Sequence, residues 1–222
     1  MRVKIYQINP LRDTNGRKFL SLKENENVNS SIYDEVFNAE IDEENPEEIF
    51  TRFNTVGHPL FRGHSLSVSD VISLNGKSYI CQNKGFKEIP FDISKTQKPD
   101  NLMKVVYVEP NKPAYVAEVE HTLNAEQKAV CGYIETVYIE DDNTCLICNE
   151  EAKLIGMEGN RRIGDGSSVI AGPFFVVGLT EEDFRGLTDK EVTKYMDRFK
   201  EPEQISQESV QRDTGITIIT LM

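Results

Sequence analysis

The chain lacks tryptophan and has few histidines and cysteines, three and four among 222 residues. It also lacks any apolar run close to the ~18 residues that a membrane-spanning helix needs. The longest apolar runs, residues 174–177 and 216–221, have the length and β-branched composition of strands. The N-terminal residues alternate polar and apolar side chains without the apolar core of a signal peptide, which predicts a cytoplasmic protein.

Two of the four cysteines, Cys145 and Cys148, have the spacing of one half of a zinc site. The sequence offers no second pair of ligands and no histidine close by, and cytoplasmic proteins keep their thiols reduced. We therefore interpret both as small apolar residues of a strand, and we expect no metal and no cofactor.

Positive charge is scarce as well, because 25 Lys and Arg stand against 37 Asp and Glu, a net charge of −12. The excess is uneven, with 13 against 15 in residues 1–100 and 12 against 22 in residues 101–222. Phosphate neutralisation needs a basic face, so we expect no direct binding of nucleic acid. An acidic second half would instead mimic nucleic acid, dock on a basic partner or only keep the protein soluble.

Strand and helix signals fall in two groups, which is typical of an α+β protein with two small modules, each a mostly antiparallel sheet with flanking helices. We place the first module at residues 1–90, a linker at 91–103, an acidic second module at 104–200 and a tail at 201–222. The linker is assigned from its weak hydrophobic periodicity. The tail contains the predicted strand described above.

In the first module, residues 18–22 alternate as a strand and residues 46–53 have the signals of a helix that begins at a proline. Residues 32–41 fit a helix and a strand about equally well. Asn75 and Gly76 stand between two apolar runs and predict a tight hairpin turn.

In the second module, residues 133–139 and 144–148 are expected to pair as a hairpin. Asn124 is expected to cap a helix, and Thr180 and Thr188 each precede an acidic residue by three positions, as in a capping box. A stripe on one helical face is interpreted as core packing, and it consists of Val192, Tyr195, Met196 and Phe199.

One stretch of the first module carries a recognisable pattern. Residues 61–72 read FRGHSLSVSDVI and are followed by Gly76, Tyr79 and the pair Gly85-Phe86. Together with YQI at the start of the chain and the helix near residues 49–54, this pattern resembles the YodL-like domain family. The resemblance covers about the first 90 residues.

A second set of motifs lies in the acidic half, namely CGYIE from Cys131, CNEEAKL from Cys148, the pair Asn160-Arg161, and IAGPFFVVG from Ile170. The set is similar to the family of domains of unknown function numbered 3846 and covers roughly residues 103–200. That family has glycine at the positions of Cys131 and Ala152. A positive φ at Ala152 would be strained in this chain.

The two resemblances imply a bacterial protein, often of Gram-positive gut species, encoded on conjugative elements or prophages among antirestriction and DNA-processing genes. Neither family has an agreed enzymatic activity or cofactor. The resemblance therefore implies a biological setting more than a chemistry.

The candidate interaction residues of the first module are Arg62, Gly63, His64, Ser65, Ser67 and Asp70. They include the residue types of a hydrolase triad, but a triad is assembled from separate elements rather than from one short segment. We expect the serines and the aspartate to satisfy main-chain groups in a turn, and the arginine to bind a carboxylate. Contact with a partner and binding of a small ligand remain the functional alternatives.

The candidate interaction residues of the second module are Asn149, Glu150, Glu151, Asn160 and Arg161. Adjacent glutamates on a strand point to opposite faces, which disfavours a cation shared between them. Pairing of Glu150 or Glu151 with Arg161 across a hairpin is the simpler interpretation.

With no catalytic constellation in the sequence, the leading hypothesis is a non-enzymatic accessory protein of a phage or conjugative element. It would bind a host or element protein, with counter-defence as one role. The first alternative is a DNA-mimic antirestriction protein. The second is a protein that binds a nucleotide or another small molecule.

Overall fold

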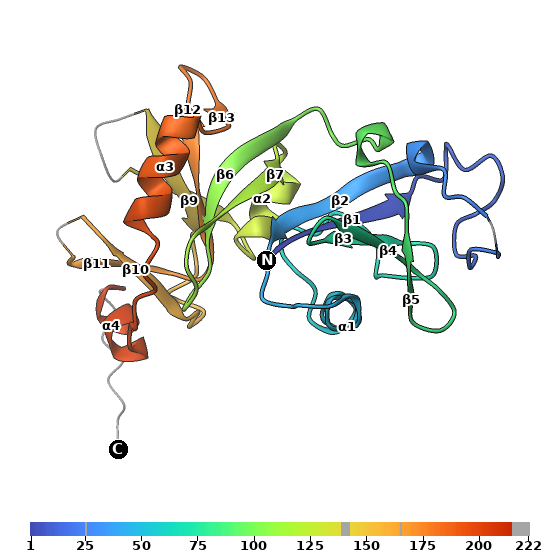
Figure 1. Ribbon diagram of the computed structural model, residues 1–222. Coiled ribbons are helices and arrows are strands. Elements are labelled where there is room, and N and C mark those ends of the chain that lie inside the picture. The colour runs from blue at the N-terminus through green and yellow to red at the C-terminus, as the bar shows by residue number, and fades with distance from the viewer. Residues whose placement is uncertain (25, 139–142, 165, 215–222) are drawn as a thin grey trace. The chain divides into compact units, whose positions relative to one another are not determined.

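The computed structural model describes residues 1–24, 26–138, 143–164 and 166–214, and the chain divides into two compact units, Met1–Asp100 and Asn101–Met222. Each unit is built on a mostly antiparallel sheet with a few helices (Figure 1), so the predicted α+β class is confirmed. None of the helices in the described residues has the length and apolar character needed to cross a bilayer.

The sheet of the first unit has the strand order β2-β1-β3-β4-β5. Its strands are β1 (Arg2–Ile8), β2 (Tyr33–Glu40), β3 (Val71–Leu74), β4 (Lys77–Cys81) and β5 (Phe86–Ile89). The predicted hairpin turn between β3 and β4 is confirmed, because Asn75 and Gly76 have φ values of 51° and 74°. The ambiguous segment 32–41 is a strand, since it pairs with β1 along its whole length.

One face of this sheet is covered by α1 (Pro46–Thr55), the predicted helix, which Asn45 caps by accepting a bond from the N–H of Glu48. Ile49 and Phe53 are the buried residues of this helix, and the ring of Phe53 lies 4.8 Å from that of Phe37 in β2. Aromatic contacts of this kind add to the stabilisation that apolar burial supplies.

The opposite face is covered by the segment between β1 and β2. The predicted strand at residues 18–22 is wrong, because this segment forms a loop that lies against the sheet. Leu22 packs against the core formed by Tyr6, Tyr33 and Ile80, and the N–H of Phe19 donates to Ser69 Oγ at 2.9 Å. Of the apolar residues in 18–22, only Leu22 packs on the sheet, whereas Phe19 and Leu20 are about half exposed.

Residues 91–103, expected as a linker, contain regular structure. The 3-10 helix η2 (Ile93–Lys95) is followed by Gln97, whose main chain bonds to Tyr33 and Glu35 of β2. The next strand begins at Leu102. The bridge to β2 gives the main-chain groups of Gln97 hydrogen-bond partners. Weak hydrophobic periodicity does not predict such a bridge.

The main sheet of the second unit has the order β7-β6-β12-β9-β8, with β13 (Phe184–Arg185) paired beside β12. Its other strands are β6 (Leu102–Val108), β7 (Tyr115–Glu120), β8 (Ile134–Val137), β9 (Thr144–Asn149) and β12 (Phe174–Leu179). The predicted hairpin of β8 and β9 is confirmed. A separate two-stranded sheet consists of β10 (Gly159–Ile163) and β11 (Ser168–Ala171).

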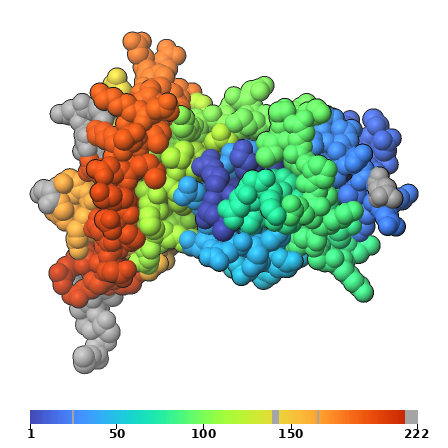
Figure 2. Space-filling view, viewed as in Figure 1, coloured from blue at the N-terminus to red at the C-terminus, as the bar shows by residue number. Residues whose placement is uncertain are grey.

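Helices cover both faces of the main sheet. On one face, α3 (Asp189–Arg198) packs through the predicted stripe, and Tyr195 and Phe199 are fully buried there. On the other face, the Tyr107 hydroxyl donates to the carbonyl of Ala129 at the end of α2 (Leu123–Ala129). Figure 2 shows α3 and the chain after it as a continuous band on the surface of this unit.

The helix caps in the second unit agree only partly with prediction. Thr188 forms the predicted capping box with Glu191 at the start of α3. Thr180 does not cap a helix, because its hydroxyl and N–H both bond to the Asp183 carbonyl in a turn before β13. Thr122 rather than Asn124 caps α2.

The tail contains α4 (Gln207–Arg212), whose Val210 is buried against β11. The strand predicted at residues 216–221 lies outside the described residues. Cys145 and Cys148 are buried on β9, which confirms their interpretation as strand residues. Burial raises the pKa of the two thiols to about 11 and about 12.

Candidate functional site

The polar residues of the first unit meet around the side chain of Gln7, which is buried in β1. Its Nε2 donates to the His64 carbonyl at 2.8 Å and to Asp70 Oδ2 at 2.9 Å, and its Oε1 accepts from the His64 N–H at 3.0 Å. A Cβ on Gly63 would lie 2.2 Å from Gln7 Oε1. Any larger residue at position 63 would therefore collide with the Gln7 amide and disturb its bonds to the loop.

Asp70 lies at the end of the same loop and is 1% exposed. Its Oδ2 also accepts from the Ser67 N–H at 2.8 Å, whereas Oδ1 has no hydrogen-bond partner within the described part of the chain. Desolvation by burial raises the pKa of this carboxyl to about 7, against the lowering effect of its hydrogen bonds.

The remaining candidates of the first unit also form hydrogen bonds that involve main-chain groups. Arg62 Nη2 donates to the Glu35 carbonyl at 3.0 Å, and the Ser65 carbonyl contacts His64 Nδ1 at 2.8 Å. Gln7, Ser67 and Asp70 thus fix the loop that leads into β3. The cluster is a buried connection between β1 and this loop, and its geometry supplies no exposed nucleophile and base in contact.

Asn149 of the second unit has a comparable role at the end of β9. Its Nδ2 donates to the carbonyls of Val130 and Cys131, and its Oδ1 accepts from the Glu151 N–H at 2.8 Å. A Cβ on Gly132 would lie 2.3 Å from Asn149 Nδ2. Cys131 is the residue with positive φ in this turn, at 60°, which accounts for the glycine that the related family has there.

Asn160 and Arg161 are both buried, and Arg161 is 1% exposed. Asn160 Nδ2 donates to the carbonyls of Val108 and Gly172. Arg161 Nη2 donates to the carbonyls of Lys112 and Phe199, at 2.7 and 3.0 Å. The guanidinium therefore connects the end of α3, at Phe199, to the turn between β6 and β7, at Lys112.

The expected pairing of Arg161 with Glu150 or Glu151 is wrong, because both glutamates are exposed and the guanidinium is buried among main-chain acceptors. Burial lowers the pKa of Arg161. The carboxylates are therefore available to solvent or to a partner, whereas the arginine is a structural residue.

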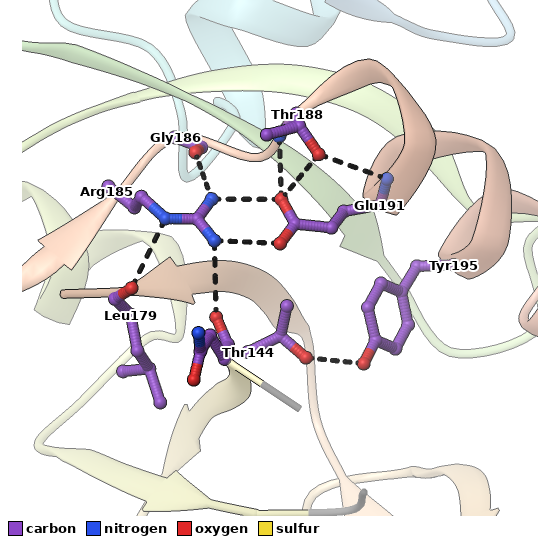
Figure 3. A network of polar contacts seen from close by, with 8 residues as sticks. Thr144, Leu179, Arg185, Gly186, Thr188, Glu191 and Tyr195 are labelled. Atoms are coloured by element: carbon purple, nitrogen blue, oxygen red, sulfur yellow. Dashed lines mark hydrogen bonds and ion pairs between the residues drawn. The ribbon is translucent and has the colours of Figure 1, made fainter. Parts of the chain in front are cut away.

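A second arginine, Arg185, holds the start of α3 in place (Figure 3). Its two terminal nitrogens bond to the two carboxylate oxygens of Glu191 at 2.9 and 2.8 Å, and its Nε donates to the Leu179 carbonyl. The N–H of Thr188 also donates to Glu191. The hydrogen bonds from Arg185, together with those from Thr188, lower the pKa of the Glu191 carboxyl to about 2. Below it, the hydroxyls of Thr144 and Tyr195 are 2.5 Å apart.

A surface cavity that the contacts described above do not account for lies beside β8. A cavity of about 400 Å³ separates the β8–β9 hairpin from the β10–β11 hairpin. Its walls include Val137, Leu154 and Ile170, and two carboxylates, Glu135 and Glu150, also line it. Lys153 in the wall is ion-paired with Asp213.

Exposed apolar side chains gather around this cavity. The described part of the second unit has five large ones, and four of them are related to the cavity wall. Leu154 lines the cavity, Ile155 and Tyr138 each follow a wall residue in the chain, and the carbonyl of Tyr133 accepts a bond from the N–H of the wall residue Glu150. Leu154 is 64% exposed. We call this set, together with Glu135, Val137, Glu150 and Glu151, the β8 surface.

The carboxylates of the β8 surface have no cationic partner. In the described residues, no ion pair involves Glu135, Glu150 or Glu151, whereas Asp189, Glu191, Asp197, Glu208 and Asp213 each pair with a lysine or arginine. The described residues also contain no group of three His, Cys, Asp or Glu placed to hold a metal. The β8 surface is thus apolar at its centre and negatively charged around it.

Sequence reasoning identified Glu150 and Glu151 but missed the apolar members of the β8 surface and missed Gln7. Leu154 and Ile155 follow the acidic pair after only Ala152 and Lys153, so two large apolar residues in a turn were the available signal. Gln7 follows Val3 and Ile5 on the core-facing side of its strand, where a polar residue requires a buried partner.

Comparison with family models matches residues 2–91 to the YodL-like domain and residues 103–200 to a domain of unknown function, DUF3846. The chain thus carries a match to the YodL-like domain followed by a match to DUF3846. This is the order that the motifs predicted. No curated protein and no solved structure matches the chain.

Proposed function

We propose that this protein is a non-enzymatic binding protein whose DUF3846 domain holds a basic, partly apolar segment of another protein on the β8 surface. The observation that carries the proposal is a cavity of about 400 Å³ whose walls combine the exposed Leu154 and other apolar side chains with the unpaired carboxylates of Glu135 and Glu150. Apolar patches with a polar border are typical of protein interaction sites.

The charge distribution supports a protein partner over a role as a DNA mimic. A mimic presents free carboxylates at the spacing of duplex phosphates, but several carboxylates of this domain are neutralised by neighbouring cations. The unpaired Glu135 and Glu150 line a cavity with apolar walls, which suits lysine and arginine because their apolar stems pack on such walls.

The buried polar residues support a role without catalysis. Gln7, Asp70, Asn149 and Arg161 all bond to main-chain groups, so the residues that resembled catalytic candidates already have structural partners. The proposal includes a cytoplasmic setting on a mobile genetic element, with a host or element protein as the partner and counter-defence as the outcome.

Selection of random peptides displayed on phage, with the immobilised full chain as bait, tests the proposal. We expect enriched peptides to carry a net positive charge and β-branched residues. Enrichment should disappear with the double variant Leu154→Ser, Ile155→Ser, which removes apolar surface without adding charge. It should persist with Leu123→Ser, which changes a similarly exposed leucine, 60% exposed, on α2. Acidic peptides, or equal enrichment by both variants, would contradict it.

A further inference from the structure

We infer that the partner segment binds by adding a strand to the free edge of β8, an inference that rests on the function proposed above. β8 is the last strand of the main sheet and pairs only with β9 among the described residues. A strand at a sheet edge presents unpaired N–H and C=O groups that another chain can complete.

The hydrogen-bond pattern identifies which main-chain groups are free. The N–H of Glu150 donates to the Tyr133 carbonyl at 2.9 Å, one step before the registered pair of Ile134 with Asn149. Bonded and non-bonded pairs alternate along an antiparallel ladder, so Glu135 and Val137 exchange bonds with β9. The N–H and C=O groups of Ile134 and Thr136 consequently point away from the sheet.

The side chains of β8 define what the added strand carries. Glu135 and Val137 both line the cavity, so they lie on one face of the strand, and an added strand places its own residues beside them. A lysine or arginine beside Glu135 forms a cross-strand ion pair, and an apolar side chain beside Val137 enters the cavity. The expected segment therefore has a basic residue two positions from a β-branched or aliphatic one.

A second copy of this chain fits the edge less well. Self-pairing of β8 would bring the acidic β8 surfaces of two copies together, with Glu135, Glu150 and Glu151 of each facing like charges. Like charges across a strand pair are destabilising. The charge of the β8 surface thus selects a basic segment of a different protein.

The probe is a fluorescently labelled, end-capped peptide that repeats the unit Lys-Thr-Val-Thr, so that lysine and valine stand two positions apart on one face of a strand. Its affinity for the full chain is measured by anisotropy. Two further peptides are N-methylated, one at every lysine and valine and one at every threonine. The N–H groups of alternate residues point to opposite edges of a strand, so only one of the two loses its bonds to β8. We expect that peptide to bind at least about tenfold more weakly, and the other to bind like the parent.

The variant Thr136→Pro removes the outward N–H and should lose binding. It should still fold, because proline is tolerated on edge strands where the N–H faces solvent. Thr136→Val keeps the N–H and should retain binding. Binding of both methylated peptides with the affinity of the parent would overturn strand addition and leave the proposed function standing. The control repeats Glu-Thr-Val-Thr and should not bind. Failure of the parent peptide to bind more tightly than this control would overturn both.

Discussion

The side-chain amide of Gln7 bonds to both main-chain groups of His64, accepting from its N–H at 3.0 Å and donating to its carbonyl at 2.8 Å. The two residues stand 57 positions apart in the chain. This contact fixes the loop before β3 to the centre of the sheet, as a strand partner would. The loop motif that marks the YodL-like domain is therefore a packing motif in this structure.

Replacement of Gln7 by leucine should destabilise the protein by about 3 kcal/mol, because the buried His64 main-chain groups and Asp70 lose their partner. Gly63→Ala should cost about 1–3 kcal/mol, since its Cβ would overlap the amide. Urea unfolding measures both. A double-mutant cycle is the control: Gly63→Ala should cost less in a Gln7→Ala background, where the overlap is relieved, and an unchanged cost would contradict the contact.

Asp70 should make stability fall as pH rises. Its folded pKa, raised to about 7 from 3.8, means that the folded protein binds more protons than the unfolded chain between these values. The contribution to stability is full below pH 3.8 and is lost as pH rises toward and through 7, on the order of 3 kcal/mol between pH 5 and 8. Asp70→Asn should remove this dependence.

The measurement is urea unfolding of wild type and Asp70→Asn at pH 5 and pH 8. We expect the variant to gain stability relative to wild type at the higher pH, because the asparagine carbonyl can still accept from Ser67 and Gln7 without a buried charge. A difference between the two proteins that does not change with pH would show that the carboxyl is not desolvated as described.

Arg161→Met should destabilise the protein by about 3 kcal/mol, because it keeps most of the side-chain volume but leaves the carbonyls of Lys112 and Phe199 without these donors. The adjacent Arg162 is exposed, and Arg162→Met should change stability by no more than about 0.5 kcal/mol. Thermal unfolding of the two variants compares a buried with an exposed arginine. Similar costs would argue against the structural role of Arg161.

The ion pair of Arg185 and Glu191 should stabilise the protein mainly above pH 4.5. The folded pKa of Glu191 is lowered from 4.5 to about 2, so its contribution is present above the higher value and is lost as pH falls toward the lower one. Glu191→Gln should cost about 1–2 kcal/mol at pH 7 and less at pH 3. Asp189→Asn in the same helix, whose side chain is 96% exposed, should cost little at either pH.

Short-range patterns predicted much of the fold. The turn at Asn75 and Gly76 and the capping box at Thr188 depend on neighbours within a few positions, so the sequence contains all the information they need. Thr180 has the same spacing as Thr188, but β13 pairs beside β12 and replaces the expected helix. Tertiary pairing decided between two conformations that the local pattern allowed.

The polar residues were predicted to matter, but their partners were not. Arg161 was expected to pair with a nearby glutamate because arginine is rarely buried without a carboxylate. In the fold, main-chain carbonyls from distant segments converge on it instead. The β8 surface escaped prediction for a related reason, since its cavity exists only where two hairpins lie side by side.

The binding role of the β8 surface is tested most directly by amide NMR shifts of the full chain during titration with the lysine and valine peptide. We predict that the largest shifts fall on Glu135, Thr136, Val137 and Leu154, and that they saturate. Shifts spread over the acidic residues at large, or concentrated on the loop that holds His64, would contradict the proposal that the β8 surface is the binding site.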